Sequence, residues 1–133
     1  EIPRRVVAGV DYNKLSLILA VLEKHAGMKY YNKDVFTNVA GGMRLNEPGG
    51  DLAFANALVA SFHDRPAPAD VMPIGEITLA GEIRPVAQIS RRIAEGRRFG
   101  FKKFVVAEGT EINDERGIIR VKTVRDAMRV IFD

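Results

Sequence analysis

The run from Asn38 to Pro85 contains the signals that decide the fold: NVAGGMRLNEPGGDLAFANALVASFHDRPAPADVMPIGEITLAGEIRP. After the glycine pair Gly49-Gly50, the spacing of apolar residues predicts a helix that runs to about His63. Pro48 suits the start of this helix, and Asp51 suits its first turn. Its predicted buried side consists of Leu52, Ala55, Leu58, Val59 and Phe62. The small side chains that predict a close approach to a sheet are Ala53, Ala57 and Ala60.

Downstream of this helix the pattern changes to strands. Residues Met72 to Val86 are expected to form two strands joined around Ala80-Gly81, which is a hairpin. A helix is predicted over Gln88 to Phe99. Its apolar seam is narrow and comprises Ile89, Ile93 and Phe99, while its other faces are polar and mostly basic.

The rest of the chain continues the alternation of strands and helices. A β-branched run, VVAGV, follows Arg4-Arg5, and an amphipathic helix is predicted from Tyr12 to His25, with Gly27 as its stop. VFTNVAGG, KKFVVAEG and GIIRVK are predicted strands, and Thr123 is expected to cap a final helix. We therefore predict a single α/β domain over residues 1–133, with a mixed sheet and packed helices.

Composition excludes several classes of protein. The 133 residues include no cysteine, which excludes a disulfide framework, a cysteine-based zinc site and a cysteine nucleophile. No apolar run approaches the roughly 18 residues of a membrane span, so we expect no membrane partner. The chain starts at Glu1 without a methionine or a signal-peptide pattern, and we expect a fragment of a longer protein.

Charge is distributed unevenly along the chain. From Arg84 to Lys103 seven basic residues face one acid, Glu95, a net +6 within a chain whose total is +3. Such a segment is typical either of a surface for a polyanion or of a solvated helix face. Its charge alone does not decide between the two.

Conventional catalytic and cofactor signatures are missing from the sequence. Ser61 and His63 are two positions apart on a predicted helix and point to different sides, and His25 near a helix end fits a capping role. Two isolated histidines do not predict a metal site. The chain contains no GxxxxGK[ST], and no GxGxxG after a strand, so we expect no nucleotide cofactor and no small-molecule substrate.

The order of these elements, and ADV…GEITL…GEIRP above all, resembles the proteolytic domain of Lon-type ATP-dependent proteases over roughly Val35 to Val106. That resemblance implies a serine in the turn before the helix and a lysine in the helix after the strand pair. When positions are counted outward from ADV…GEITL without gaps, the serine position is Gly49 and the lysine position is Arg92. Glycine has no nucleophile and arginine stays protonated, so the resemblance implies a Lon-like fold without a peptidase.

RRVVAGVDYNKLSLILAVLEK, DVFTNVAGGMRLNEPGGDLAFA and GEITLAGEIRPV narrow the resemblance to the C-terminal, Lon-like domain of the RadA family, also called Sms, over about Arg4 to Val106. An arginine at the lysine position, here Arg92, is the pattern of that family. Two positions depart from that pattern. Lys14 stands where arginine is more usual in the family, and Gly49-Gly50 stands where serine and alanine can occur.

The RadA resemblance implies a bacterial, cytoplasmic, hexameric ATPase of DNA recombination and repair that loads on single-stranded or branched DNA. For this chain it implies a scaffold that supports the ring and contacts DNA phosphates, with no cofactor and no metal of its own. The implied DNA-binding residues are Arg5, Lys14, Arg44 and Arg84, which we expect to converge on one surface. The alternatives are a Ser-Lys peptidase domain and a pure oligomerisation module. What Arg91, Arg92, Arg97 and Arg98 contact is left open by the sequence.

Overall fold

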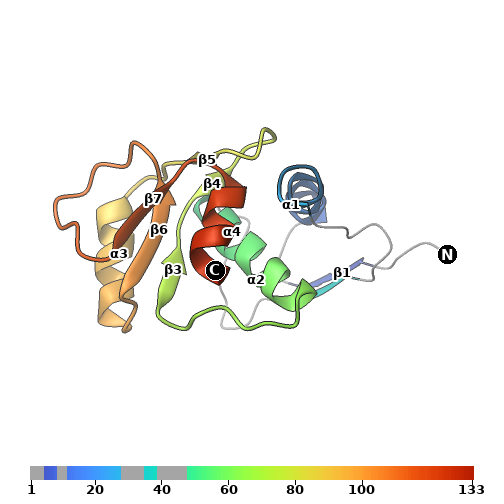
Figure 1. Ribbon diagram of the computed structural model, residues 1–133, viewed down its shortest axis with the longest axis horizontal. Helices are drawn as coiled ribbons and strands as arrows, with labels where there is room; N and C mark the ends of the chain where they lie inside the picture. Colours follow the sequence, from blue (N-terminus) through green and yellow to red (C-terminus); the bar gives the residue numbers. More distant parts are fainter. Residues whose placement is uncertain (1–4, 9–11, 28–34, 39–47) are drawn as a thin grey trace.

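A computed structural model describes residues 5–8, 12–27, 35–38 and 48–133 of the chain. Its elements follow the order β1 (Arg5–Ala8), α1 (Tyr12–His25), β2 (Val35–Asn38), the short 3-10 turn η1 (Pro48–Gly50), α2 (Asp51–Phe62), β3 (Val71–Pro73), β4 (Glu76–Ile77), β5 (Ile83–Arg84), α3 (Ile89–Arg98), β6 (Lys103–Ala107), β7 (Ile118–Val121) and α4 (Val124–Phe132). Strands and helices alternate as predicted, and the fold is a small α/β domain (Figure 1).

Three sets of paired strands make up the described sheet structure. β3, β6 and β7 form a parallel sheet with β6 in the centre, and β1 pairs with β2 in parallel. β4 and β5 form the antiparallel pair of a hairpin. The predicted mixture of parallel and antiparallel pairing is therefore present, but in separate small sheets.

The central strand β6 is buried on both faces, which is typical of a parallel sheet covered by helices. Phe104 and Val106 pack with Ile93 of α3 in one cluster, while Val105 and Ala107 belong to the larger cluster formed with α1, α2 and α4. The period-2 alternation of the strand thus divides its side chains between two cores. Figure 1 shows α3 on one side of this sheet and α4 and α2 on the other.

Local signals in the sequence explain the element ends. Thr123 Oγ1 accepts a hydrogen bond from the Asp126 amide at 3.1 Å, as expected for the N-cap of α4. Gly27, with φ of 73°, follows the end of α1, where only glycine adopts the left-handed conformation readily. Pro48 opens η1, which leads directly into α2.

Three expectations from the sequence are wrong in detail. Met72 lies in β3 and pairs with Phe104 of β6, so it is not part of the hairpin, which is limited to β4 and β5. Phe99 is 81% exposed and does not belong to the seam of α3, because the helix ends at Arg98 and the chain then turns. Ala57 is exposed and permits no close approach by a sheet, since it lies on the outer side of α2.

Candidate functional site

Gly49 and Arg92, the two positions that the Lon resemblance assigns to a Ser-Lys dyad, lie against each other. Gly49 is the middle residue of η1, and Arg92 belongs to the first turn of α3. A Cβ built on Gly49 would lie 3.1 Å from Arg92 Nη1 and 3.2 Å from Arg92 Cζ. The guanidinium of Arg92 thus occupies the space into which a side chain at position 49 would project.

Hydrogen bonds to backbone carbonyls hold both Gly49 and Arg92 in place. The Gly75 amide donates to Gly49 O at 3.2 Å, and the Leu52 amide donates to Gly75 O at 3.0 Å, which ties the turn to the segment before β4. Arg92 Nε donates to Ala87 O at 3.0 Å. The hydrogen bond from Nε therefore orients the guanidinium group of Arg92 beside Gly49.

Next to this turn, a carboxylate is buried at the start of α2. Asp51 is 1% exposed, and its Oδ2 accepts a hydrogen bond from the Ile77 amide at 3.0 Å. Its Oδ1 lies 2.8 Å from Lys14 Nζ on α1. A buried carboxylate needs such a pairing, and its place at a helix N-terminus adds a favourable interaction with the helix dipole.

The ion pair explains the unfavourable place of Lys14 near the start of a helix. The helix dipole disfavours a cation at that end of a helix, and Asp51 supplies the opposite charge. The Lys14 side chain is only 18% exposed and is held by Asp51, so Lys14 is not an ordinary surface charge. Its proposed contact with DNA stays a prediction.

The other three predicted DNA-binding residues are less completely described. Arg84 is exposed at the end of β5, where Glu76 is its partner in the strand register. Arg5 begins β1, but its side chain lies outside the described part of the structure. Arg44 lies outside the described residues altogether. The predicted convergence of the four on one surface thus stays a prediction.

The basic side chains of α3 have separate environments. Arg97 turns inward, where its Nη2 donates to Asp114 O at 3.0 Å and to Arg116 O at 2.7 Å. Its Cζ also lies 5.5 Å from the centre of the Phe104 ring. Arg97 therefore fastens the loop before β7 onto α3, whereas Arg91 and Arg98 are exposed.

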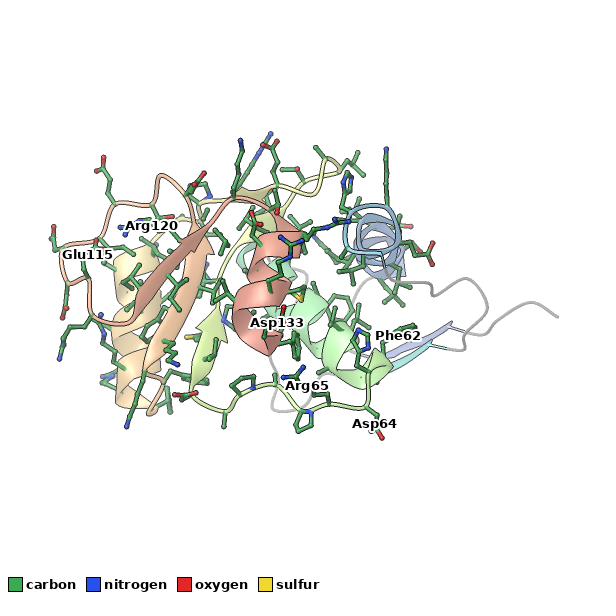
Figure 2. All side chains as sticks on the ribbon, in the orientation of Figure 1. Phe62, Asp64, Arg65, Glu115, Arg120 and Asp133 are labelled. Atoms are coloured by element: carbon green, nitrogen blue, oxygen red, sulfur yellow. The ribbon has the colours of Figure 1, made fainter. Side chains whose placement is uncertain are left out.

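That loop carries two acid–arginine pairs. Asp114 accepts hydrogen bonds from Arg116, which lower the pKa of the Asp114 carboxyl from 3.8 to about 2, with burial opposing and the charges of Arg116 and Arg97 assisting. A hydrogen bond from Arg120 likewise lowers the pKa of Glu115. Figure 2 shows Glu115 and Arg120 on this loop and β7. The first pair links two residues of the loop, and the second ties the loop to β7.

A groove with a basic rim lies at the end of α4, where Figure 2 labels Arg65 and Asp133. Its volume is about 630 Å³, and it is lined by Ala26, Val59, His63, Arg65, Arg125, Met128, Arg129, Phe132 and Asp133. Arg65 Cζ lies 5.8 Å from the centre of the Phe132 ring, and Arg125 Nε donates to His25 O at 2.9 Å. Sequence reasoning missed this groove, and the only local signal was the spacing of Arg125 and Arg129 on one helix face.

Other kinds of site find little support in the described part of the chain. His25 Nε2 lies 3.2 Å from Leu79 O, and its ring packs under Gly81, which makes it a structural residue of the hairpin contact. Among the residues that the structure describes, no three His, Asp or Glu side chains are grouped as metal ligands would be. Within the same ranges, no helix has both the length and the apolar character needed to cross a bilayer.

Comparison with known proteins assigns the family. Residues 14–110 match the family described as subunit ChlI of Mg-chelatase. Over 97% of its length the chain is 42% identical to DNA repair protein RadA of Haemophilus influenzae, of which it covers 29%. It is 41% identical over 98% of its length to DNA repair protein RadA of Escherichia coli, again covering 29% of that protein. The RadA of Synechocystis sp. is 47% identical over 87% of this chain, which covers 23% of the relative.

The chain belongs to the RadA and ChlI families. The RadA relatives carry the name of a DNA repair protein, and the chain spans less than a third of their length. The RadA resemblance drawn from the sequence motifs is confirmed. The Lon-like character of the fold, and the roles of individual residues, remain predictions.

Proposed function

We propose that this chain is a non-proteolytic, Lon-like scaffold domain of a RadA-type DNA recombination and repair ATPase. In this role it supports a hexameric ring and contacts DNA phosphates, and the ATPase and branch-migration activities belong to the whole protein. The proposal depends above all on one observation, the guanidinium of Arg92 packed against Gly49.

This contact is incompatible with Ser-Lys chemistry. A peptidase of that class needs a hydroxyl at one position and a neutral amine at the other. Gly49 supplies no side chain, and a guanidinium retains its proton at any ordinary pH. The short distance adds a steric reason, because a serine side chain at position 49 would meet Arg92 before it met any substrate.

Contact with DNA is supported by the family and by the predicted basic residues. Arg84 is exposed at a strand end, a place where loops and element ends commonly carry function. Arg5 begins the first strand, and Arg44 follows the glycine turn Gly41-Gly42 in the sequence. In a ring, each weak phosphate contact is repeated by every subunit, which raises the total affinity without new chemistry.

A pure oligomerisation module is the second candidate. It accounts for RadA membership equally well and leaves the basic residues as solvated charges. The two functions differ in the salt dependence of DNA binding, since only phosphate contacts release counterions.

The test uses the full-length protein in two assays. Incubation with unfolded casein should leave the substrate intact, and cleavage that copurifies and is abolished by a mutation in this segment would contradict the proposal. Arg5, Arg44 and Arg84 are then replaced together by alanine, which should weaken single-stranded DNA binding for all sequences and reduce the salt slope by roughly 0.7 per lost contact. An unchanged slope, with the hexamer intact by native mass spectrometry, would favour the oligomerisation module.

A further inference from the structure

An aromatic side chain is exposed among cations where α3 ends. The sequence there is Arg97-Arg98-Phe99-Gly100-Phe101-Lys102-Lys103. Phe99 is 81% exposed, more than the two other large apolar side chains that stand out on the described surface, Leu79 and Val130. The fold gains little from burial of this ring, which leaves its faces accessible to a partner.

The fold itself does not require Phe99. The Phe101 amide donates to Gly96 O at 3.0 Å, and the Gly100 amide donates to Arg97 O at 3.1 Å. With φ of 97° at Gly100, these bonds form the Schellman motif that ends α3. Phe101 packs against the smaller core, whereas Phe99 points away from both cores.

Exposed cations flank Phe99 in the sequence, namely Arg98, Lys102 and Lys103. The acid Asp70 adjoins two of them, because the Lys102 and Lys103 amides donate to Asp70 O at 2.9 and 3.1 Å. Arg91 is also exposed, and it lies on the same face of α3 as Arg98, because residues seven apart on a helix lie on one side. Glu95 is the acid of this stretch and lies 4.0 Å from Arg98, an exposed pair that holds neither side chain firmly.

We propose that Phe99 is a stacking platform for an unpaired base of single-stranded DNA, with Arg98, Lys102 and Lys103 binding the flanking phosphates. Proteins that bind single strands without sequence preference combine these two features, a basic track and exposed aromatic rings. An apolar docking site for a protein or a bilayer would need a wider apolar face, and the exposed residues of α3 are polar apart from the small Ala94. The inference rests on the proposed contact with DNA, but it uses a different surface and a different interaction.

The experiment measures binding of a labelled oligothymidylate to the full-length protein by fluorescence anisotropy. Phe99→Ala should weaken binding at least about fivefold, because stacking of one base on an aromatic ring is worth at least that factor. The salt slope should stay unchanged, since no phosphate contact is lost. Phe99→Tyr should retain the wild-type affinity, because tyrosine presents the same ring face.

Leu79→Ala is the matched control, since Leu79 is 72% exposed at the turn of the hairpin and lies outside the basic track. It should leave binding unchanged. An abasic strand of equal length, which offers phosphates but no rings, should bind the wild-type protein at least about fivefold more weakly and be insensitive to Phe99→Ala. Phe99→Leu keeps an apolar side chain but removes the ring face, so it should weaken binding as Phe99→Ala does and tests the inference if Phe99→Ala misfolds.

Three results would overturn the stacking platform. They are equal affinity of the wild-type protein for the abasic and the base-bearing strand, equal behaviour of Phe99→Ala and Leu79→Ala, and a change of assembly state on native mass spectrometry in Phe99→Ala without loss of strand affinity. The last result would assign Phe99 to a contact with a second copy. If the variant of Arg5, Arg44 and Arg84 loses salt slope while Phe99→Ala binds normally, this inference alone fails and the proposed function stands.

Discussion

Replacing Gly49 by alanine tests whether Arg92 fills the space into which a side chain at position 49 would project. The new Cβ would lie 3.1 Å from Arg92 Nη1, 3.2 Å from Cζ and 3.4 Å from Nη2, closer than ordinary van der Waals contact. Arg92 would have to retreat by a few tenths of an ångström, and its 3.0 Å hydrogen bond from Nε to Ala87 O resists that movement. The substitution is therefore expected to destabilise the protein through Arg92.

Two contributions of opposite sign set the magnitude. Overpacking costs about 1–3 kcal/mol, whereas exchanging glycine for alanine favours folding by about 0.4–1 kcal/mol through the unfolded chain. The net expectation for Gly49→Ala is a loss of about 1 kcal/mol in the free energy of unfolding. In an Arg92→Ala background the obstruction is gone, so the same substitution should be neutral or stabilise by about 0.5 kcal/mol.

The assay is a double-mutant cycle measured by urea unfolding. We expect a coupling free energy between positions 49 and 92 of about 1–2 kcal/mol. Gly109→Ala is the control, because its Cβ would meet nothing within 4 Å and its cost comes from the backbone, where φ is 82°. Its cost should be the same in both backgrounds. A coupling below about 0.3 kcal/mol between Gly49 and Arg92 would refute the reasoning.

Three further outcomes are expected. Lys14→Met should lower the free energy of unfolding by about 2–4 kcal/mol, because it leaves the buried carboxylate of Asp51 without its cation, whereas the double variant with Asp51→Asn should recover part of the loss in the same urea assay. Gly49→Ser should remain inactive against casein, since a serine without a neutral lysine has no base, and cleavage would contradict this. The ionised Asp114 accepts hydrogen bonds from Arg116 at pH values above 3.8, and this stabilisation is lost as the pH falls towards about 2. The protection factor of the Arg116 amide, which is its exchange rate corrected for the intrinsic pH dependence, should therefore fall across that window in the wild type and be low throughout in Asp114→Ala.

The sequence by itself determined the elements and their approximate ends. Tyr12–His25 is a helix as predicted from the spacing of Leu15, Ile18 and Leu22, and Thr123 caps α4 as expected. These features depend on residues three or four positions apart, whose contacts form within one helix. The motifs were also sufficient to assign RadA membership, because the order of residues in runs such as GEITLAGEIRPV is specific to the family and does not depend on the tertiary structure.

Pairing between distant segments was decided only by the tertiary structure. The sequence placed Gly49 and Arg92 at the two dyad positions, but their contact depends on how α3 docks over η1. The ion pair between Lys14 and Asp51 likewise depends on how α1 docks against the start of α2, and no local pattern predicted it.

The misplaced side chains have the same physical origin. Apolar spacing placed Phe99 in the seam of α3, whereas the Schellman turn at Gly100 selects Phe101 for the core and leaves Phe99 in water. The inward turn of Arg97 likewise depends on a loop that follows β6. Periodicity reports which face of one element is apolar, while the partner of each side chain depends on the docking of elements far apart in the chain, which no local pattern encodes.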